Sequence, residues 1–324
     1  MKALRFERFG SVREVLRLED VPDPKPAKDE VLIRIAAASI NPSDTKNILG
    51  KMEGTTLPRT PGRDFAGTVI SGPAALQGRE VFGSGGEIGF TRDGAHAGQI
   101  VVPAEGVAIK PARISMAEAA SVGTNFVTAY AGLIHAAKVK SGEWVVVTGA
   151  RGGVGSSVIQ LAKWKGARVI AVDRGAADAA FIRQYGIDLM LNTGADDIST
   201  RVKEATGGRG ADIAYDCVGG PLFEICLETL GQLGRQVNIT SVGERRVSFD
   251  LLDFYHRRLT LYGIDSRALD TRDCARILSE LAPAFESGTL RAPRIAQITP
   301  LEGFAEAYEA VETGKARGKV VFVS

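Results

Sequence analysis

The sequence has no marked excess of charge of either sign: 40 lysines and arginines stand against 38 aspartates and glutamates in 324 residues. So close a balance gives no electrostatic reason to expect nucleic acid or an anionic membrane surface as a partner. No apolar run approaches the ~18 residues that a membrane span needs. The first residues turn charged at once, unlike a signal peptide. We therefore expect no nucleic-acid partner and no membrane partner.

Cysteine is also scarce, with only Cys217, Cys226 and Cys274. These three residues make neither a disulfide framework nor a ligand-like pair, so we expect a reducing, cytoplasmic setting. Glycine, in contrast, is abundant at 38 residues, which indicates many tight turns or close approaches of the backbone to a ligand.

Two kinds of sequence pattern alternate along the chain. Short strands separated by Pro and Gly clusters fill the first 115 residues or so, which indicates a mainly β domain. Apolar strands then alternate with helices, which predicts a parallel sheet covered on both faces. The fold class is therefore α/β, with a doubly wound parallel sheet inserted into a mainly β domain. The predicted boundaries are 1–117, 118–264 and 265–324.

The last sixty residues change character again. A helix is expected over 271–287, bent or shortened by Pro283. Thr299-Pro300-Leu301-Glu302 has the form of a capping box at the start of a second helix. Lys319 to Val323 is a closing strand, and we expect this tail to fold back onto the first domain.

A glycine-rich turn follows a predicted strand and opens a predicted helix at Val147-Thr148-Gly149-Ala150-Arg151-Gly152-Gly153-Val154-Gly155-Ser156. This context is typical of dinucleotide binding, because the helix N-terminus offers free N–H groups to the pyrophosphate. Gly152 lets the backbone approach the phosphates, and Gly155 lets the helix pack closely. The alternative is a tight turn that binds nothing. The candidate coenzyme-binding residues here are Gly149, Ala150, Gly152, Gly153, Val154 and Gly155.

The next strand ends at Asp173-Arg174, 18 residues past Gly155. A carboxylate at this point normally accepts hydrogen bonds from the adenosine ribose, which favours NADH and repels the 2′-phosphate of NADPH. Arg174 argues the other way, because a guanidinium is a good phosphate ligand. The pair could also be an ordinary strand-end charge pair. We expect NAD(P)H as the cofactor, with a slight preference for NADH.

Further candidates for coenzyme binding follow two later strands at their carboxyl ends, where open α/β sheets bind ligands. They are Asp216, Val218, Gly219, Thr240 and Ser241.

With these motifs in place, the chain resembles the medium-chain dehydrogenase/reductase superfamily, and most of all its zinc-independent quinone oxidoreductase branch. The resemblance is carried by Ile40-Asn41-Pro42-Ser43-Asp44, Pro61 to Gly67, Ala119 to Thr124, Thr128-Ala129-Tyr130, the glycine-rich turn, Asp216 to Gly220 and Gly318 to Val321. It implies a GroES-like catalytic domain built from both chain ends around an inserted Rossmann domain, with the active site in the cleft. It also implies a homodimer, formed near Val247 to Ile264.

In zinc alcohol dehydrogenases of this superfamily, two cysteines and a histidine hold the catalytic ion. The resemblance places Asn41, Arg63 and Thr124 at these positions, and none of them is a competent zinc ligand there. His96, His135 and His256 are scattered and are expected to be surface or packing residues. We therefore expect no zinc.

Without a Lewis acid, simple alcohol oxidation becomes difficult, whereas hydride delivery to a quinone or an α,β-unsaturated carbonyl needs mainly positioning. Similarity to quinone reductases suggests Asn41, Asp44 and Thr124 as catalytic residues, with Thr128 and Lys319 contacting the coenzyme. Alternatives remain for each. Asn41 to Asp44 could be simple turn chemistry, Thr124 and Thr128 a helix cap and a first-turn residue, and Lys319 a solvated charge.

Two departures from the family pattern bear on function. Met52 stands where enoyl-thioester reductases carry a tyrosine thought to be catalytic, which weakens that alternative. The residues after Asp173, and Thr193 further on, lack the signature of members that prefer NADPH. An enoyl-CoA reductase would need a basic groove, for which Arg257-Arg258 or Arg245-Arg246 are candidates. The third possibility is a nucleotide-binding protein with little turnover.

Overall fold

The computed structural model describes residues 1–323, and the chain divides into two compact units. Unit 1 consists of Met1–Val127 together with residues from Ser266 on, and unit 2 is Thr128–Asp265. One unit is therefore built from both ends of the chain and the other is inserted into it. The sequence suggested a first boundary after residue 117, at the start of helix α3 (Met116–Tyr130), whereas the units divide within that helix.

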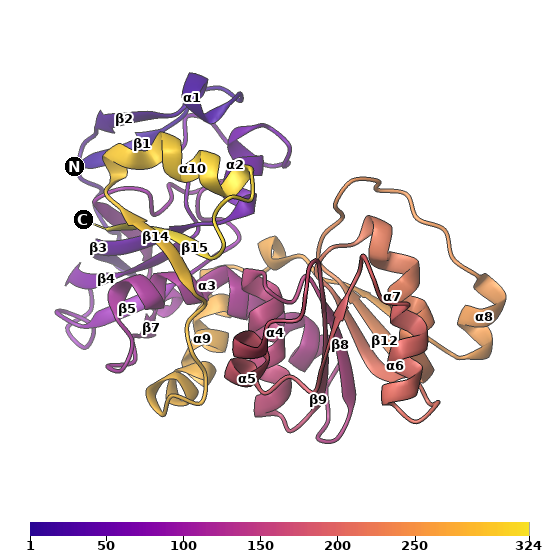
Figure 1. Cartoon of the computed structure of the whole chain (residues 1–324). Helices are drawn as coiled ribbons and strands as arrows, with labels where there is room; N and C mark the ends of the chain where they lie inside the picture. Colours follow the sequence, from indigo (N-terminus) through magenta and orange to yellow (C-terminus); the bar gives the residue numbers. More distant parts are fainter. Residues whose placement is uncertain (324) are drawn as a thin grey trace. The chain divides into compact units, whose positions relative to one another are not determined.

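Unit 2 is built on a six-stranded parallel sheet with the strand order β10-β9-β8-β11-β12-β13 (Figure 1). The chain runs outward from the centre of the sheet to one edge, returns, and then runs outward to the other edge. This doubly wound topology confirms the predicted fold class. The bounds are β8 Trp144–Thr148, β9 Arg168–Asp173, β10 Leu189–Asn192, β11 Ala211–Asp216, β12 Leu230–Asn238 and β13 Thr260–Gly263.

Helices cover this sheet. Side chains of α6 and α7 pack with one face of the central strands in a single core cluster, and α4 packs on β8 and β9. Val145, Val146 and Val147 of β8 are all fully buried, which explains why the strand reads as a continuous apolar run. The helices are α4 Gly153–Trp164, α5 Ala179–Tyr185, α6 Ile198–Ala205, α7 Phe223–Thr229 and α8 Leu251–His256, and a π-helical turn spans Ala131–Ala136.

Unit 1 is mainly β. Its larger sheet has the order β14-β15-β3-β4-β5-β7, with β6 also paired to β3, and β1 and β2 form a separate ladder. The bounds are β1 Lys2–Arg5, β2 Arg17–Asp20, β3 Glu30–Ile40, β4 Asp64–Ser71, β5 Glu80–Gly83, β6 Gln99–Pro103, β7 Ala108–Ile109, β14 Ile295–Thr299 and β15 Lys319–Val323. Because β15 pairs antiparallel with β3, the tail folds back onto the first domain as expected.

The expected helix over 271–287 is formed as α9 (Thr271–Glu286), and Pro283 does not shorten it, because the helix continues three residues past the proline. The predicted capping box is wrong, because Thr299 is paired with Phe322 as the last residue of β14 and its backbone belongs to the sheet. A 3₁₀ turn at Leu301–Gly303 then leads into α10 (Phe304–Glu312).

The remaining helices of unit 1 are α1 (Val12–Val15) and α2 (Pro42–Ile48). Leu4, Phe6, Ile48, Tyr308 and Phe322 belong to one core cluster, which therefore joins the first and last segments of the chain. Within residues 1–323, no helix is both long and apolar enough to cross a membrane.

Candidate active site

A buried carboxylate, Asp64, lies at the centre of a polar cluster in unit 1. Asp64 begins β4 and is completely buried. Its Oδ1 accepts hydrogen bonds from the Thr124 backbone N–H at 2.8 Å and from Thr124 Oγ1 at 2.7 Å. A Cβ on Gly123 would lie 2.4 Å from this oxygen, so only glycine lets α3 approach the carboxylate so closely. Thr124 is therefore fixed against Asp64.

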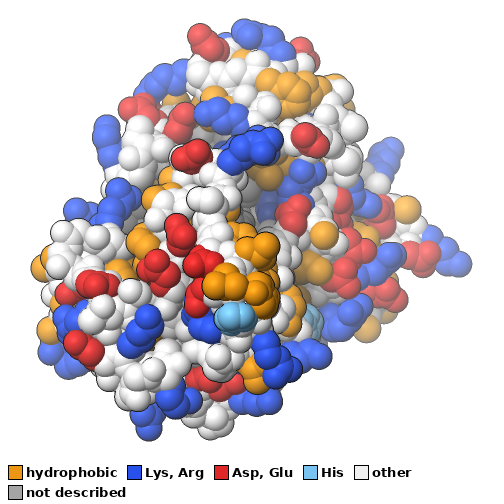
Figure 2. Space-filling view, turned by 90° about the vertical axis from the view of Figure 1, so that its right-hand side faces the viewer, with side chains coloured by type: hydrophobic (Ala, Val, Ile, Leu, Met, Phe, Trp, Pro, Cys, Tyr) orange, Lys and Arg blue, Asp and Glu red, His pale blue; other side chains and the backbone are white. Residues whose placement is uncertain are grey.

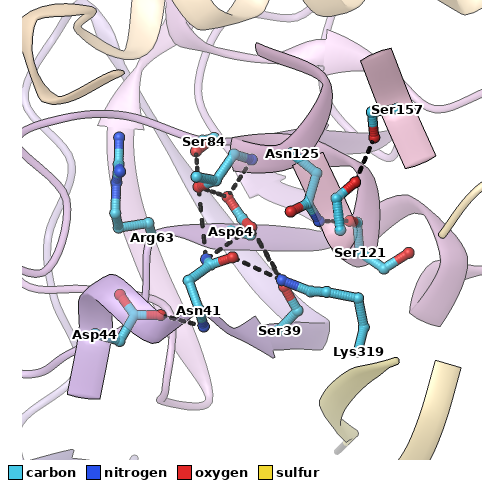
Figure 3. Close-up of polar contacts among 12 residues, drawn as sticks. Ser39, Asn41, Asp44, Arg63, Asp64, Ser84, Ser121, Asn125, Ser157 and Lys319 are labelled. Atoms are coloured by element: carbon cyan, nitrogen blue, oxygen red, sulfur yellow. Dashed lines mark hydrogen bonds and ion pairs between the residues drawn. The ribbon is translucent and has the colours of Figure 1, made fainter. Parts of the chain in front are cut away.

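Lys319 supplies the cation of this cluster. Its Nζ donates to Asn41 Oδ1 at 2.6 Å and lies 3.9 Å from Asp64 Oδ2. Asn41 Nδ2 donates to the same Asp64 oxygen at 2.9 Å, so the three side chains point toward one another (Figure 3). Lys319 is only 6% exposed, and the possibility of a solvated charge is therefore wrong.

Burial and charge act against each other in this cluster. Burial acts to raise the pKa of Asp64, but Lys319 and the hydrogen bonds from Asn41 and Thr124 hold that pKa below its usual value. Burial lowers the pKa of Lys319, and the two carboxylates Asp64 and Asp44 oppose that effect. Removing either member of such a buried pair would leave an uncompensated charge.

Asn41 and Asp44 mark the start of α2 rather than a simple turn. Asn41 is the N-cap with Pro42 following it, and Asp44 Oδ2 accepts a hydrogen bond from the Asn41 backbone N–H at 2.8 Å. Asp44 is 1% exposed, and its burial, aided by the nearby charge of Asp64, raises its pKa to about 7. Asp44 therefore orders the segment that carries Asn41.

The three residues at the implied zinc-ligand positions do not form a common donor set. Asn41 and Thr124 meet, with Nδ2 and Oγ1 3.5 Å apart. The Arg63 side chain points away from Asn41 instead (Figure 3). It donates to Gly85 O at 3.0 Å and to both oxygens of Ser266 at 3.0 and 3.1 Å. An amide, a hydroxyl and a guanidinium directed elsewhere do not fit a zinc ion. Across the described residues 1–323, no three His, Cys, Asp or Glu side chains group as metal ligands.

His96 and Tyr308 support the cluster and were not among the predicted site residues. His96 is completely buried; its Nδ1 lies 2.7 Å from the Tyr308 hydroxyl and its Nε2 3.3 Å from Ser39 O. Burial lowers the pKa of His96 to about 4, so the ring is neutral and holds the strand that leads to Asn41. His96 belongs to no sequence motif, and its supporting role is recognised only from its contact with Tyr308 in the C-terminal tail.

Thr124 and Thr128 both lie inside α3, so neither is a helix cap or a first-turn residue. They fall in different units: Thr124 belongs to the Asp64 cluster, whereas the Thr128 backbone oxygen accepts a hydrogen bond from the Tyr215 hydroxyl at 2.7 Å in unit 2.

In unit 2 the glycine-rich turn has the geometry of a phosphate cradle. Gly149 has a φ of +58°, which favours glycine. A Cβ on Gly155 would lie 2.2 Å from Gly149 O, which makes glycine necessary where the helix packs against the turn. A Cβ on Gly152 would meet only Gly149 O, at 3.1 Å. Gly152 is the N-cap of α4, so the first N–H groups of a 12-residue helix follow it directly.

At the end of β9, Asp173 binds the turn. Its Oδ2 accepts a hydrogen bond from the Arg151 backbone N–H and its Oδ1 from the Arg174 backbone N–H, both at 2.7 Å. The nearest guanidinium is that of Arg151, 4.0 Å from Oδ1, so the predicted strand-end pair is formed with Arg151 rather than Arg174. Arg151 was not among the predicted site residues, although a charged residue inside a glycine-rich turn is itself a signal.

The remaining candidates line the same edge of the sheet. Asp216 is fully buried, and its Oδ1 accepts from Thr148 Oγ1 at 2.6 Å and from the N–H groups of Val218 and Gly219 at 3.0 and 2.9 Å. It therefore shapes the turn after β11. Gly219 has a φ of +68°, and a Cβ there would lie 2.2 Å from Thr240 O. The turn is thus brought against the segment that carries Thr240 and Ser241.

Comparison with known proteins agrees with this arrangement. The Alcohol dehydrogenase GroES-like domain family matches residues 27–112, and the Zinc-binding dehydrogenase family matches residues 153–282. A zinc-type alcohol dehydrogenase-like protein of Schizosaccharomyces pombe is 38% identical over 89% of this chain and 86% of its own length. The 2-methylene-furan-3-one reductase of Solanum lycopersicum is 34% identical over 99% of this chain and 78% of its own.

The solved structure of a mycobacterial quinone oxidoreductase matches all of both chains with 27% identity and a TM-score of 0.86. The fold is thus a Rossmann unit inserted into a GroES-like unit. The chain belongs to the medium-chain dehydrogenase/reductase superfamily, in its quinone oxidoreductase branch. It is an NAD(P)H-dependent oxidoreductase, which confirms the expected class of enzyme.

Proposed function

We propose that this enzyme reduces quinones or α,β-unsaturated carbonyl compounds without a metal ion. The observation that carries the proposal is the Asn41–Asp64–Lys319 cluster: at the positions of zinc ligands it has a neutral amide, and it has a buried ammonium for its cation. An acceptor that is already electrophilic needs positioning and a nearby hydrogen-bond donor, not a Lewis acid.

The residues of unit 2 fit a nicotinamide dinucleotide. Gly149 to Gly155 and the N-terminus of α4 would hold the pyrophosphate, and Asp173 with Arg174 would meet the adenosine ribose. Val218, Gly219, Thr240, Ser241 and Thr128 are proposed to complete the site. Asp216 would act through the turn it shapes. Reduced coenzyme, when bound, supplies the hydride that the acceptor takes up together with a proton.

In unit 1, Lys319 is the proposed donor that favours negative charge developing on the acceptor oxygen, while the single hydroxyl proton of Thr124 is donated to Asp64 Oδ1 and holds that carboxylate in place. Asn41 is held by hydrogen bonds on both ends of its amide, so it orients Lys319 and Thr124 in addition to any contact with substrate. Asp44 fixes Asn41 through the start of α2. In this proposal the chain's own residues supply the orientation and the electrostatics.

The test is to follow the absorbance of NADH and NADPH when the purified protein meets an ortho-quinone, a short enone and a short enoyl-CoA, with and without a chelator. Oxidation with the quinone or enone that survives the chelator supports the proposal. Oxidation confined to the thioester would favour an enoyl-CoA reductase instead. Arg257 gives that alternative little support, because it bonds to Asp253 and to the carbonyl oxygens of Leu227 and Leu230. Coenzyme binding without turnover of any acceptor would favour the nucleotide-binding alternative.

We also propose a homodimer formed through the β13 edge of unit 2. The sheet ends at β13, and Val247, Leu251, Leu252 and Tyr255, in the segment that precedes β13 in the sequence, are 42 to 65% exposed. Figure 1 shows α8 at the outer edge of the unit, and Figure 2, viewed from that side, shows apolar side chains gathered there. Light scattering should find two chains, and the double substitution Leu251→Asp and Leu252→Asp should yield one. A single chain before substitution would exclude the dimer.

A further inference from the structure

Arg151 is the one charged residue of the Gly149–Gly155 turn, and its side chain leaves the turn for the loop after β9. Nη1 donates to Arg174 O at 3.0 Å, and Nη2 donates to Ala176 O at 2.7 Å. The guanidinium carbon lies 5.8 Å from the ring centre of Phe181 in α5. Arg151 therefore joins the glycine-rich turn to the loop that would border the adenosine ribose of a bound coenzyme.

The same guanidinium faces Asp173, the residue expected to select the coenzyme. Nη1 lies 4.0 Å from Asp173 Oδ1, and the two side chains are 31% and 18% exposed. Both carboxylate oxygens of Asp173 already accept backbone hydrogen bonds, from Arg151 and Arg174. The negative charge that would repel a 2′-phosphate is therefore screened by an adjacent cation and by two N–H groups.

A 2′-phosphate is bound where an arginine lies near the ribose end of the second strand. An arginine has five N–H donors; two of those on Arg151 are used in the bonds to the loop carbonyl oxygens, and Nη2 also donates to the weak acceptor Met190 Sδ at 4.0 Å, which leaves two N–H groups for a ligand. Its partly exposed guanidinium is thus available for charge-assisted bonds to a phosphate.

We propose that Arg151 determines coenzyme specificity: it screens Asp173 and binds the 2′-phosphate, so that the enzyme accepts NADPH as well as NADH. This inference rests on the proposed binding of a nicotinamide dinucleotide in unit 2. It assigns to a residue of the phosphate turn the selection that the sequence pattern assigns to Asp173 alone.

Affinity measured by calorimetry tests this without turnover, using the full chain with NADH, NADPH, 5′-AMP and adenosine 2′,5′-bisphosphate. Arg151→Gln should weaken NADPH and the bisphosphate about 10-fold or more, as expected for loss of a charged hydrogen bond, and should change NADH and 5′-AMP by less than about 3-fold. Arg183→Gln, at an exposed position of α5, is the matched control and should leave the affinities for all four ligands unchanged.

Arg151→Lys separates charge from the loop contacts, because lysine keeps the cation but loses the planar fork. Retention of most of the bisphosphate affinity by the lysine variant supports the proposal. Equal losses for all four ligands in both variants would overturn it, because they would show that Arg151 only orders the loop.

Asp173→Ser provides a second, independent test of whether Arg151 binds the 2′-phosphate. It should raise NADPH affinity relative to NADH, and adding Arg151→Gln should remove that gain. If the gain persists in the double variant, Arg151 does not bind the phosphate. If the unsubstituted protein binds none of the four ligands, the proposed function itself is overturned. If all variants bind NADH and NADPH equally well, only the assignment of Arg151 is overturned.

Discussion

Lys319 Nζ lies 2.6 Å from Asn41 Oδ1, although the two residues are 278 positions apart in the sequence. The bond fixes which end of the Asn41 amide faces Asp64, because the oxygen is taken by the ammonium and the nitrogen is left to donate to the carboxylate. One cation therefore sets the orientation of the amide and balances the buried charge of Asp64.

Replacing the ammonium should cost both stability and rate. Lys319→Met leaves Asp64 buried without its cation, so we expect a loss of about 3–5 kcal/mol in the free energy of unfolding. We also expect kcat/KM for a quinone to fall about 100-fold. Urea unfolding and steady-state kinetics measure the two effects. Lys315→Met, an exposed lysine of the same tail, is the control and should behave like the parent. An unchanged kcat/KM in Lys319→Met would remove Lys319 from the proposed mechanism.

Thr124 allows a test with nearly constant volume. Thr124→Val loses the hydroxyl that donates to Asp64 Oδ1, whereas Thr124→Ser keeps it. A hydrogen bond to a charged group contributes about 1.5–3 kcal/mol, so the valine variant should be less stable by that amount and the serine variant should be close to the parent. Denaturant titration gives the comparison, and equal stability of the two variants would contradict the role assigned to the hydroxyl.

Substitution of two glycines of the glycine-rich turn should have different effects, one on stability and the other on coenzyme affinity. Gly155→Ala places a Cβ 2.2 Å from Gly149 O, so we expect unfolding at lower temperature and a loss of about 1–3 kcal/mol. Gly152→Ala meets Gly149 O only at 3.1 Å, so its melting temperature should change little while coenzyme affinity falls about 10-fold. Thermal melts with and without NADH distinguish them. Full coenzyme affinity in Gly152→Ala would show that the pyrophosphate lies elsewhere.

Asp44 and His96 should have opposite effects on stability as the pH changes. Burial raises the pKa of Asp44 to about 7 from 3.8, so its contribution is greatest at low pH and is lost as pH rises toward 7. Burial lowers the pKa of His96 to about 4 from 6.5, so its contribution is present above pH 6.5 and is lost as pH falls toward 4. Between pH 4.5 and 6.5, a rise in pH therefore lowers the contribution of Asp44 to the free energy of unfolding and raises the contribution of His96.

Asp44→Asn keeps an acceptor for the Asn41 N–H and removes the loss of stability with rising pH that Asp44 contributes. The free energy of unfolding of the variant, relative to the parent, should therefore rise by up to about 1.4 kcal/mol per pH unit over that interval. Urea unfolding at pH 4.5, 5.5 and 6.5 measures the difference. A difference that does not change with pH would mean that Asp44 does not titrate in this range.

The sequence predicted unit 2 well because its signals are local. The apolar run of β8 and the glycines of the turn each have a pattern that is determined by neighbours within a few residues, and the strand before the turn and the strand that ends at Asp173 are both formed. The start of α10 was predicted wrongly because Thr299 satisfies a local capping pattern, yet its backbone is taken by pairing with a distant strand residue, Phe322.

The polar cluster shows the limit of such signals. Asn41 and Asp44 were found through a short motif, but the centre of the cluster, Asp64, and its supports His96 and Tyr308 were not singled out. Their importance depends on burial and on contacts between segments hundreds of residues apart. Lys319 was suggested by resemblance alone, and its burial was visible only in the fold.

The pairing of β15 with β3 has a consequence for synthesis on the ribosome. Asn41 and Asp64 emerge early, but their cation belongs to a strand that is made only after all of unit 2. The inserted unit can fold while translation continues. The nascent first segment, by contrast, must carry an uncompensated carboxylate until the tail arrives. We therefore expect the Asn41–Asp64–Lys319 cluster to be the last part of the enzyme to form, and nascent chains that stop short of Lys319 to lack it.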